Sequence, residues 1–140
     1  MSLLSWLQQL FRKPTPAPVP SVASTDLVAG INRARRQYLL SMLSIHPVLS
    51  GTAQAWALSM ARAGVESHGD LSGRLTAAGY SGPEGECVAE GYPSSAAAVA
   101  AWMGDGPHRA IILNPSWRYI GAGVAAGADG REFWCVDFGG

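Results

Sequence analysis

Two neighbouring segments, one from Gly106 to Pro115 and one that begins at Tyr119, constrain this fold more than any other part of the chain. The first reads Gly-Pro-His-Arg-Ala-Ile-Ile-Leu-Asn-Pro, and the second reads Tyr-Ile-Gly-Ala-Gly-Val. A histidine and an arginine open a short apolar helical turn, which the Asn-Pro pair must end because proline breaks a helix from within. The glycine-punctuated run that follows is typical of a strand. The pattern predicts His108 at the start of a helix and beside a strand.

Composition indicates one domain without a strong net charge. The chain has 140 residues, of which 48% are hydrophobic and 14% are charged, enough for one core of ordinary size. Ten basic and ten acidic side chains cancel, so no net field draws the protein toward nucleic acid or an anionic membrane. The basic cluster of Arg33, Arg35 and Arg36 has no aromatic residue before Tyr38 to stack a base. We expect these arginines on a solvated helix face and no nucleic-acid partner.

Neither a membrane span nor a recognisable secretory signal is expected. No stretch approaches the roughly 20 apolar residues that cross a bilayer. The N-terminus has no basic residue before its apolar run, Gln8 and Gln9 interrupt that run, and Arg12 and Lys13 come after it. A secretory signal has the opposite order, with the basic region first.

Residues 1–13 have the pattern of an amphipathic helix followed by a spacer. The apolar residues of this pattern are Leu3, Trp6, Leu7 and Leu10, with Phe11 beside them. A helix of this length is not stable alone, so it must bury its apolar stripe against a partner, a membrane interface or its own domain. Residues 14–23 are rich in proline, which favours an extended linker. We expect a tether to a larger assembly; the alternative is a tail folded onto its own domain.

Residues 24–140 are predicted to form the globular domain. Ser24, Thr25 and Asp26 supply capping groups for a first helix that reaches Met42, and Ser50 or Thr52 caps a second helix that Gly64 ends. Shorter helices are expected over 71–78 and 96–103, and strands over 86–92, 119–125 and 132–138. Helices come first and strands late, without βαβ alternation, which predicts an α+β domain with an antiparallel sheet.

The two cysteines, Cys87 and Cys135, each lie in a strand-like apolar segment. Neither has the Cys-x-x-Cys spacing of a metal or redox site. The residues leave two alternatives, one disulfide between two strands or two buried free thiols. The compartment decides between them, because a disulfide persists only outside a reducing cytosol.

Histidines and acids supply the candidate chemistry. His68 and His108 each lie at a polar, glycine-flanked break, Glu86 opens a strand after a tight turn, and Asp105 precedes His108 by three residues. Two imidazoles and two carboxylates can share a divalent metal or act as a hydrogen-bonded acid and base. No closely spaced histidine pair fixes that geometry, so the residues alone favour structural histidines. His46 precedes a proline and is expected to be a surface or capping group.

From about Leu27 to its end, the chain resembles the bacterial type of the CAP superfamily, also called SCP or pathogenesis-related-1-like domains. The resemblance rests on these motifs, in order: Ile31-Asn32-Arg33-Ala34-Arg35 for "IN-x-x-R", Met60-Ala61, Ser67-His68, Arg74-Leu75-Thr76-Ala77-Ala78-Gly79-Tyr80 for "RL-x-x-AGY", Gly85-Glu86-Cys87 for "GEN", Ala101-Trp102-Met103 for "AWM", His108-Arg109-Ala110 for "GHRA", and Phe133-Trp134-Cys135-Val136-Asp137-Phe138-Gly139 for "YWVQ-x-FG". Each motif is weak alone, but their shared order and spacing indicate the fold strongly.

The resemblance implies an α-β-α sandwich, in which helices flank a small antiparallel sheet, with a cleft lined by His68, Glu86, His108 and a second acid. Asp105 matches that acid, although it is one methylene shorter than the family's glutamate. The cysteine of "GEC" and the cysteine of the closing strand belong to one sheet in this family, which favours a Cys87–Cys135 disulfide.

For function, the resemblance implies an extracytoplasmic, non-enzymatic binding or scaffold module. Its cleft would take a cell-envelope or lipid ligand, or a divalent metal such as zinc on His68 and His108 with Glu86 close by. The alternative is a cell-envelope hydrolase with Glu86 as general base, although no serine is a convincing nucleophile. Residues 1–13 would dock the protein into a secretion apparatus or a virus particle, with a peripheral membrane anchor as the rival.

Overall fold

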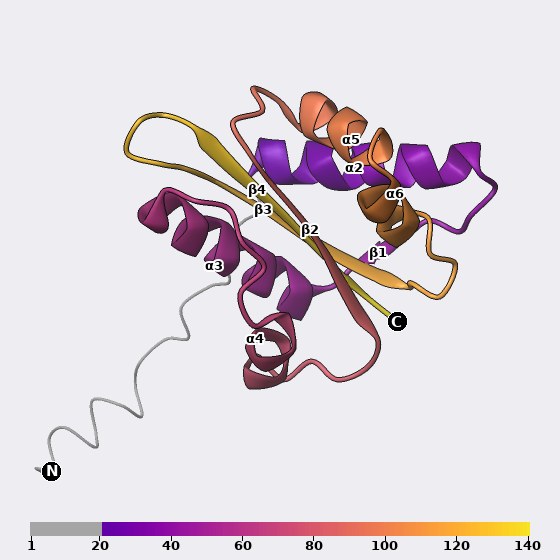
Figure 1. Ribbon diagram of the computed structural model, residues 1–140. Helices are drawn as coiled ribbons and strands as arrows, with labels where there is room; N and C mark the ends of the chain where they lie inside the picture. Colours follow the sequence, from indigo (N-terminus) through magenta and orange to yellow (C-terminus); the bar gives the residue numbers. More distant parts are fainter. Residues whose placement is uncertain (1–20) are drawn as a thin grey trace, which may run out of the picture.

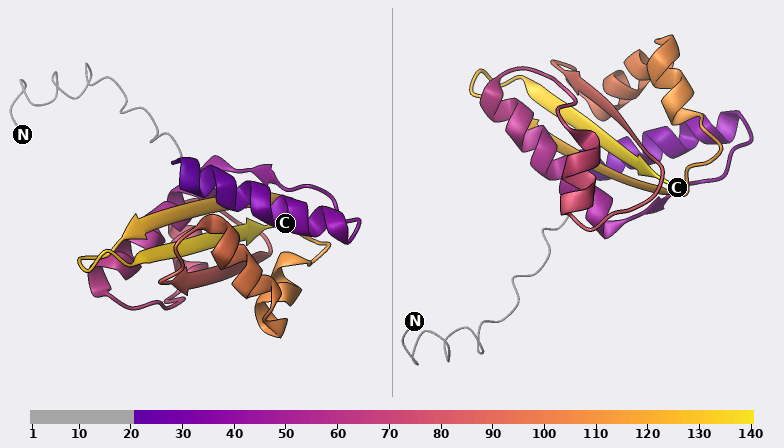
Figure 2. Two further views of the ribbon diagram at one scale, coloured as in Figure 1. Left: turned by 90° about the horizontal axis from the view of Figure 1, so that it is seen from above. Right: turned by 60° about the horizontal axis from the view of Figure 1, so that its bottom comes forward.

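The computed structural model describes residues 21–140, which form a sheet between two layers of helices. Helices α2, α5 and α6 cover one face of the sheet, and α3 and α4 cover the other (Figures 1 and 2). The helices are α2 (Val22–Gln37), α3 (Pro47–Ala63), α4 (Leu71–Ala77), α5 (Ser95–Met103) and α6 (Gly106–Ile112), and the strands are β1 (Ser44–Ile45), β2 (Glu84–Glu90), β3 (Tyr119–Ala126) and β4 (Glu132–Gly139). The expected α+β sandwich is confirmed. The segment 1–13 and residues 14–20 of the expected linker lie outside the described residues.

The sheet has four strands in the order β1-β3-β4-β2. Strands β3 and β4 form an antiparallel hairpin, and β2 pairs antiparallel with the other side of β4, where it forms one edge of the sheet. The two-residue strand β1 pairs in parallel with the start of β3 and was not predicted. The fold is therefore the expected antiparallel sheet with one short parallel strand added.

The helix ends follow their capping groups, at positions that differ in part from the prediction. Ser21 caps α2 by accepting a hydrogen bond from the backbone of Ser24 at 3.1 Å, so the helix starts at residue 22 and includes two residues of the expected linker. It ends at residue 37, well before the predicted Met42. His46 caps α3 through Nδ1, 3.1 Å from the Val48 nitrogen, which confirms its capping role and replaces the expected cap at Ser50 or Thr52.

Helix α3 lies directly on β3 because two glycines leave room for its backbone. A Cβ atom placed on Gly121 would lie 2.1 Å from the backbone nitrogen of Ser50, and one on Gly123 would lie 2.4 Å from the Cα of Gln54. The side chain of Gln54 hydrogen-bonds to both backbone groups of Val124, at 3.0 and 3.1 Å. Close backbone contact thus fixes the position of α3 relative to β3.

Arg35 departs from the solvated helix face that we expected for the basic cluster. Arg33 and Arg36 are exposed, but Arg35 is fully buried at 0% exposure. Its Nε donates to the carbonyl of Ser41 at 3.0 Å, and one terminal nitrogen donates to the carbonyls of Ile112 and Asn114 at 2.8 Å each. Burial lowers the pKa of this guanidinium below its ordinary value. Arg35 therefore ties the loop after α2 to the end of α6.

The expected disulfide is not formed, because Cys87 and Cys135 are both free and buried. In the register of β2 with β4, Cys87 lies opposite Val136, and Cys135 lies opposite Val88. Successive residues of a strand point to opposite faces, so an offset of one residue sends the two thiols to different faces. Cys87 packs among residues of α2 and α5, and Cys135 packs among residues of α3.

Within residues 21–140, no helix is long and apolar enough to cross a membrane.

Candidate functional site

Two buried carboxylic acids face each other beneath α3. Glu86 of β2 is directly opposite Asp137 of β4 in the strand register. The two residues are 3% and 0% exposed. Directly opposed residues of an antiparallel pair share a face of the sheet. Here that face is the one that packs against α3, so both carboxyl groups lie between the sheet and this helix.

Arg74 of α4 supplies the cation for this acid pair. Its terminal nitrogens lie 2.7 Å from Glu86 Oε2 and 3.9 Å from Asp137 Oδ2. Its guanidinium carbon lies 4.2 Å from the centre of the Trp56 ring, a cation–π distance. Thr52 of α3 donates a hydrogen bond to Asp137 Oδ2 at 2.8 Å. One guanidinium and one hydroxyl thus cover the acids from the α3–α4 side.

The acid pair holds a proton near neutral pH. Burial, the hydrogen bond with Glu86 and the charge of Glu86 raise the pKa of Asp137 to about 8. With Asp137 protonated, the pair carries a single negative charge, which the charge of Arg74 balances. Cys135 lies 3.5 Å from Glu86 Oε2 and 3.6 Å from Asp137 Oδ1 through its sulfur. Burial and these acids raise its pKa well above the ordinary value, so it stays a thiol.

Glu86, Cys135 and Asp137 also meet the distance requirement of a metal site. Their ligand atoms lie within 4.8 Å of one another, and among residues 21–140 they form the one group of three or more potential ligands that is this compact. Arg74 already binds Glu86 and lies close to Asp137. A guanidinium therefore occupies the side of this cluster that faces α4.

His68 contacts Glu86. Its Nδ1 lies 3.0 Å from Glu86 Oε1, and its side chain is 54% exposed. The backbone carbonyl of His68 accepts a hydrogen bond from Arg74 at 2.8 Å, which holds the loop before α4 in place. A carboxylate can only accept, so Nδ1 donates in this contact, and in a neutral ring the lone pair is then on Nε2.

His108 and Asp105 form a second imidazole–carboxylate pair at the start of α6. Asp105 caps this helix, and its Oδ2 lies 2.6 Å from His108 Nδ1. The His108 side chain is 31% exposed. Asp105 therefore contacts the histidine in its own helical turn. The four residues predicted for the cleft form two separate pairs, His68 with Glu86 and His108 with Asp105, and no hydrogen bond joins one pair to the other.

Both pairs nevertheless lie beside the same stretch of the edge strand β2. Glu86 contacts His68 on the α3 side, and the next residue, Cys87, has its sulfur 3.9 Å from the His108 carbonyl on the other side. His68 thus contacts this strand through its imidazole and His108 through its backbone carbonyl, on opposite faces of the sheet.

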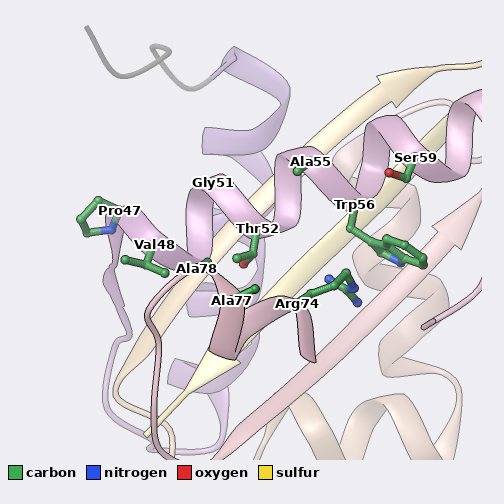
Figure 3. Close-up of a pocket in the computed structure, with 10 residues that line it drawn as sticks. All are labelled: Pro47, Val48, Gly51, Thr52, Ala55, Trp56, Ser59, Arg74, Ala77 and Ala78. Atoms are coloured by element: carbon green, nitrogen blue, oxygen red, sulfur yellow. The ribbon is translucent and has the colours of Figure 1, made fainter. Parts of the chain in front are cut away.

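A groove of about 610 Å³ separates α3 from α4, and the sequence did not predict it. Figure 3 shows its lining residues, with the side chains of Arg74 and Trp56 next to each other. The lining consists of Pro47, Val48, Gly51, Thr52, Ala55, Trp56, Ser59, Arg74, Ala77 and Ala78. None of the four residues predicted for the cleft lines this groove. Two of its polar residues, Thr52 and Arg74, contact the buried acids.

Sequence reasoning missed the roles of Arg74, Asp137 and Thr52 at this site. One signal was present for Asp137, which is an acid between Val136 and Phe138 in an otherwise apolar strand. A lone acid in such a run requires a buried partner. Nothing local indicated that this partner would be Arg74.

The chain belongs to the CAP family, because the sequence model of that family, described as the cysteine-rich secretory protein family, matches residues 28–138. No curated protein matches the sequence. The fold is similar to an outer surface protein of Borrelia burgdorferi, with a TM-score of 0.74 and 21% identity over 82% of this chain and 90% of the other.

Two longer bacterial proteins share the fold. One is a cysteine-rich secretory protein of Staphylococcus aureus, with a TM-score of 0.73 and 21% identity over 90% of this chain and 40% of the other. The second is an extracellular protein with an SCP domain from Bacillus anthracis, with a TM-score of 0.75 and 21% identity over 91% of this chain and 44% of the other. The chain thus spans less than half of each.

Proposed function

We propose that this chain is an extracytoplasmic binding module that holds a divalent metal ion, such as Zn²⁺, between His68 and His108. The observation that carries the proposal is that a carboxylate engages Nδ1 of each ring, at 3.0 Å in one pair and 2.6 Å in the other. Metal-binding histidines in proteins are oriented in this way, with Nε2 as the ligand atom. Further support is that the two histidines contact consecutive residues of β2, Glu86 and Cys87, at the edge of the sheet.

The names of the structural relatives support an extracytoplasmic location. They are described as an outer surface protein, a secretory protein and an extracellular protein. Free thiols are compatible with this location, because Cys87 and Cys135 are buried and burial raises the pKa of both. Thiols that are neither exposed nor ionised react slowly.

Binding is better supported than hydrolysis, because Glu86 is poorly placed to act as a general base. Its side chain is 1% exposed, and its two oxygens are engaged by His68 and Arg74. A general base must reach the proton that it removes, directly or through one water. A carboxylate that is enclosed and ion-paired in this way instead orients His68.

Zinc titration by calorimetry tests the proposal on the wild type and the variants His68→Ala and His108→Ala. We expect each variant to bind Zn²⁺ at least about tenfold more weakly, since each loses one imidazole ligand. His46→Asn is the matched control, because it removes the remaining histidine while asparagine keeps the capping function. Negligible affinity in the wild type, or equal affinity in all four proteins, would refute the metal site.

The hydrolase alternative has its own test, incubation with peptidoglycan and peptide substrates beside a Glu86→Gln variant. We expect no turnover by either protein. Turnover that the substitution abolishes would contradict the assignment of Glu86 to an orienting role.

We further propose that residues 1–13 tether the module to a larger assembly. Support comes from the apolar pattern of Leu3, Trp6, Leu7, Leu10 and Phe11 and from the proline-rich residues that follow. This segment lies outside the described residues, and its test is a deletion considered in the Discussion.

A further inference from the structure

Exposed apolar side chains lie on the loop that connects α2 to β1. This loop is at the right side of Figure 1. Nine large hydrophobic side chains are exposed among residues 21–140, and three of them, Tyr38, Leu39 and Met42, lie on this loop. Leu39 is 95% exposed and Met42 is 69% exposed. A single exposed leucine is ordinary, but a group of this size on one loop is typical of a contact surface.

The loop is held in a strained shape that pushes Leu39 outward. Leu39 has a φ of 59°, and it is the one residue other than glycine with a positive φ in the described part of the chain. The strain persists because the loop is fastened on both sides. Arg35 holds the carbonyl of Ser41, and the side-chain amide of Asn32 bonds both backbone groups of Leu43, at 2.8 and 3.2 Å. The exposure of Leu39 is therefore imposed by buried side chains.

Three exposed arginines contact this loop or β1 at its end. The Arg36 carbonyl accepts a hydrogen bond from the Leu39 nitrogen, and the Arg118 carbonyl accepts one from the Ser44 nitrogen, each at 3.0 Å. Arg109 donates to the Tyr38 hydroxyl at 2.6 Å. None of these arginines takes part in the ion pairs found within residues 21–140. The net charge of the chain is zero, so this positive charge is a local feature.

We propose that the loop Tyr38–Met42 docks on an anionic lipid surface, with Leu39 and Met42 inserted among the lipids and Arg36, Arg109 and Arg118 against the headgroups. Apolar side chains flanked by cations are the arrangement that binds membrane interfaces. The charge of the rim is complementary to anionic headgroups. A projecting, nearly fully exposed leucine also needs no matching pocket when it enters a lipid layer. This inference is independent of the proposed metal site.

Vesicle co-sedimentation of the full chain tests the proposal, with phosphatidylcholine vesicles that contain or lack phosphatidylglycerol. We expect the wild type to bind the anionic vesicles and to dissociate as salt is raised. The double variant Leu39→Gly/Met42→Ser should bind at least about tenfold more weakly, because two inserted apolar groups are lost. Arg36→Gln/Arg118→Gln should bind anionic vesicles several-fold more weakly.

Leu39→Gly separates binding from folding. Glycine adopts a positive φ without strain, so we expect the midpoint of thermal unfolding of this variant to be no lower than that of the wild type, while vesicle binding falls. Val65→Ser is the matched control, since Val65 is an exposed apolar residue just beyond α3, and its substitution should leave binding unchanged.

A Leu3→Ser/Trp6→Ser variant distinguishes the loop from the N-terminal segment as the source of lipid affinity. The proposal is overturned if the wild type does not bind anionic vesicles. It is also overturned if Leu39→Gly/Met42→Ser binds as well as the wild type, whatever the N-terminal variant does. Loss of binding in the loop variants, with the unfolding midpoint of Leu39→Gly preserved, supports it.

Discussion

At the scale of single residues, the acid pair beneath α3 shows how a small domain accommodates more buried acid than base. Two carboxyl groups, Glu86 and Asp137, share the one cation of Arg74. Burying a second, uncompensated charge is far less favourable than binding a proton. Asp137 therefore remains protonated until its raised pKa of about 8 is reached.

Asp137→Asn is predicted to change how stability depends on pH. An acid whose pKa is raised in the folded protein stabilises it fully below its unfolded pKa, and this contribution is lost as pH rises to the folded value. For Asp137 the window runs from the ordinary 3.8 to about 8, where the free energy of unfolding falls by up to about 1.4 kcal/mol per pH unit. Asparagine cannot ionise and can still donate to Glu86. In urea unfolding, the free energy of unfolding of the variant should rise relative to that of the wild type as pH rises. A constant difference between the two proteins across this pH range would contradict the prediction.

Arg74→Met is predicted to destabilise the fold by about 3–5 kcal/mol, because it leaves Glu86 buried without its cation. The double variant Arg74→Met/Glu86→Gln should recover part of this loss. Arg131→Met is the control, since Arg131 pairs with Asp129 and Glu90 at the surface and its loss should cost under about 1 kcal/mol. Denaturant unfolding measures these three variants and Glu86→Gln alone. If the losses of the two single variants add up to that of the double variant, Arg74 and Glu86 are not coupled.

The residue patterns identified the histidines and acids but not the way they pair. The contact of His108 with Asp105 is local, since one helix turn makes it. The contact of Glu86 with Asp137 depends on the register of two strands 51 positions apart in the chain, which no local pattern encodes. The same register made the disulfide prediction wrong, because one residue of offset places Cys87 and Cys135 on opposite faces.

At the scale of elements, the glycines of β3 are predicted to be irreplaceable where α3 crosses them. Gly121→Ala would place a methyl group 2.1 Å from the α3 backbone, so helix and sheet must separate, at a cost of about 1–3 kcal/mol or more. Gly51→Ala is the matched control on α3 itself. Its added methyl meets no atom within 4 Å, and alanine should stabilise the helix by about 0.5–1 kcal/mol. The midpoint of thermal unfolding should fall for Gly121→Ala and rise for Gly51→Ala. Equal shifts in the two variants would contradict the close packing of α3 on β3.

Helices and strands were predicted correctly where the spacing of apolar residues agreed with helix-ending residues such as glycine. Prediction failed where a segment takes its structure from contacts with other parts of the chain. Gly64 ends α3 as predicted, with a φ of 73°. The first helix stops early because the residues after Gln37 form the fastened loop, although Tyr38 continues the helical spacing of Leu27, Ile31 and Ala34. Strand β1 has two residues and exists only through its pairing with β3, so its own sequence carried no signal.

At the scale of the whole molecule, the described core is predicted to be independent of the N-terminal segment. The buried hydrophobic residues lie between Leu27 and Phe138, which coincides with the match to the CAP family over residues 28–138. Deleting residues 1–20 should therefore leave the thermal midpoint within a few degrees of the full chain.

If the tether proposal is correct, this deletion also abolishes association with the larger assembly. Sedimentation and unfolding together check this: a truncated protein that still associates would exclude the tether, and one that does not fold would contradict the independence of the core.

The buried guanidinium of Arg35 influences whether the loop that carries Leu39 keeps its shape when solution conditions change. Its hydrogen-bond partners are three neutral peptide carbonyls, and arginine keeps its charge throughout the accessible range of acidity. Neither acid nor base therefore removes a charge from these contacts. We expect the projecting leucine tip to be preorganised, with an outline that a change of acidity does not alter through this arginine.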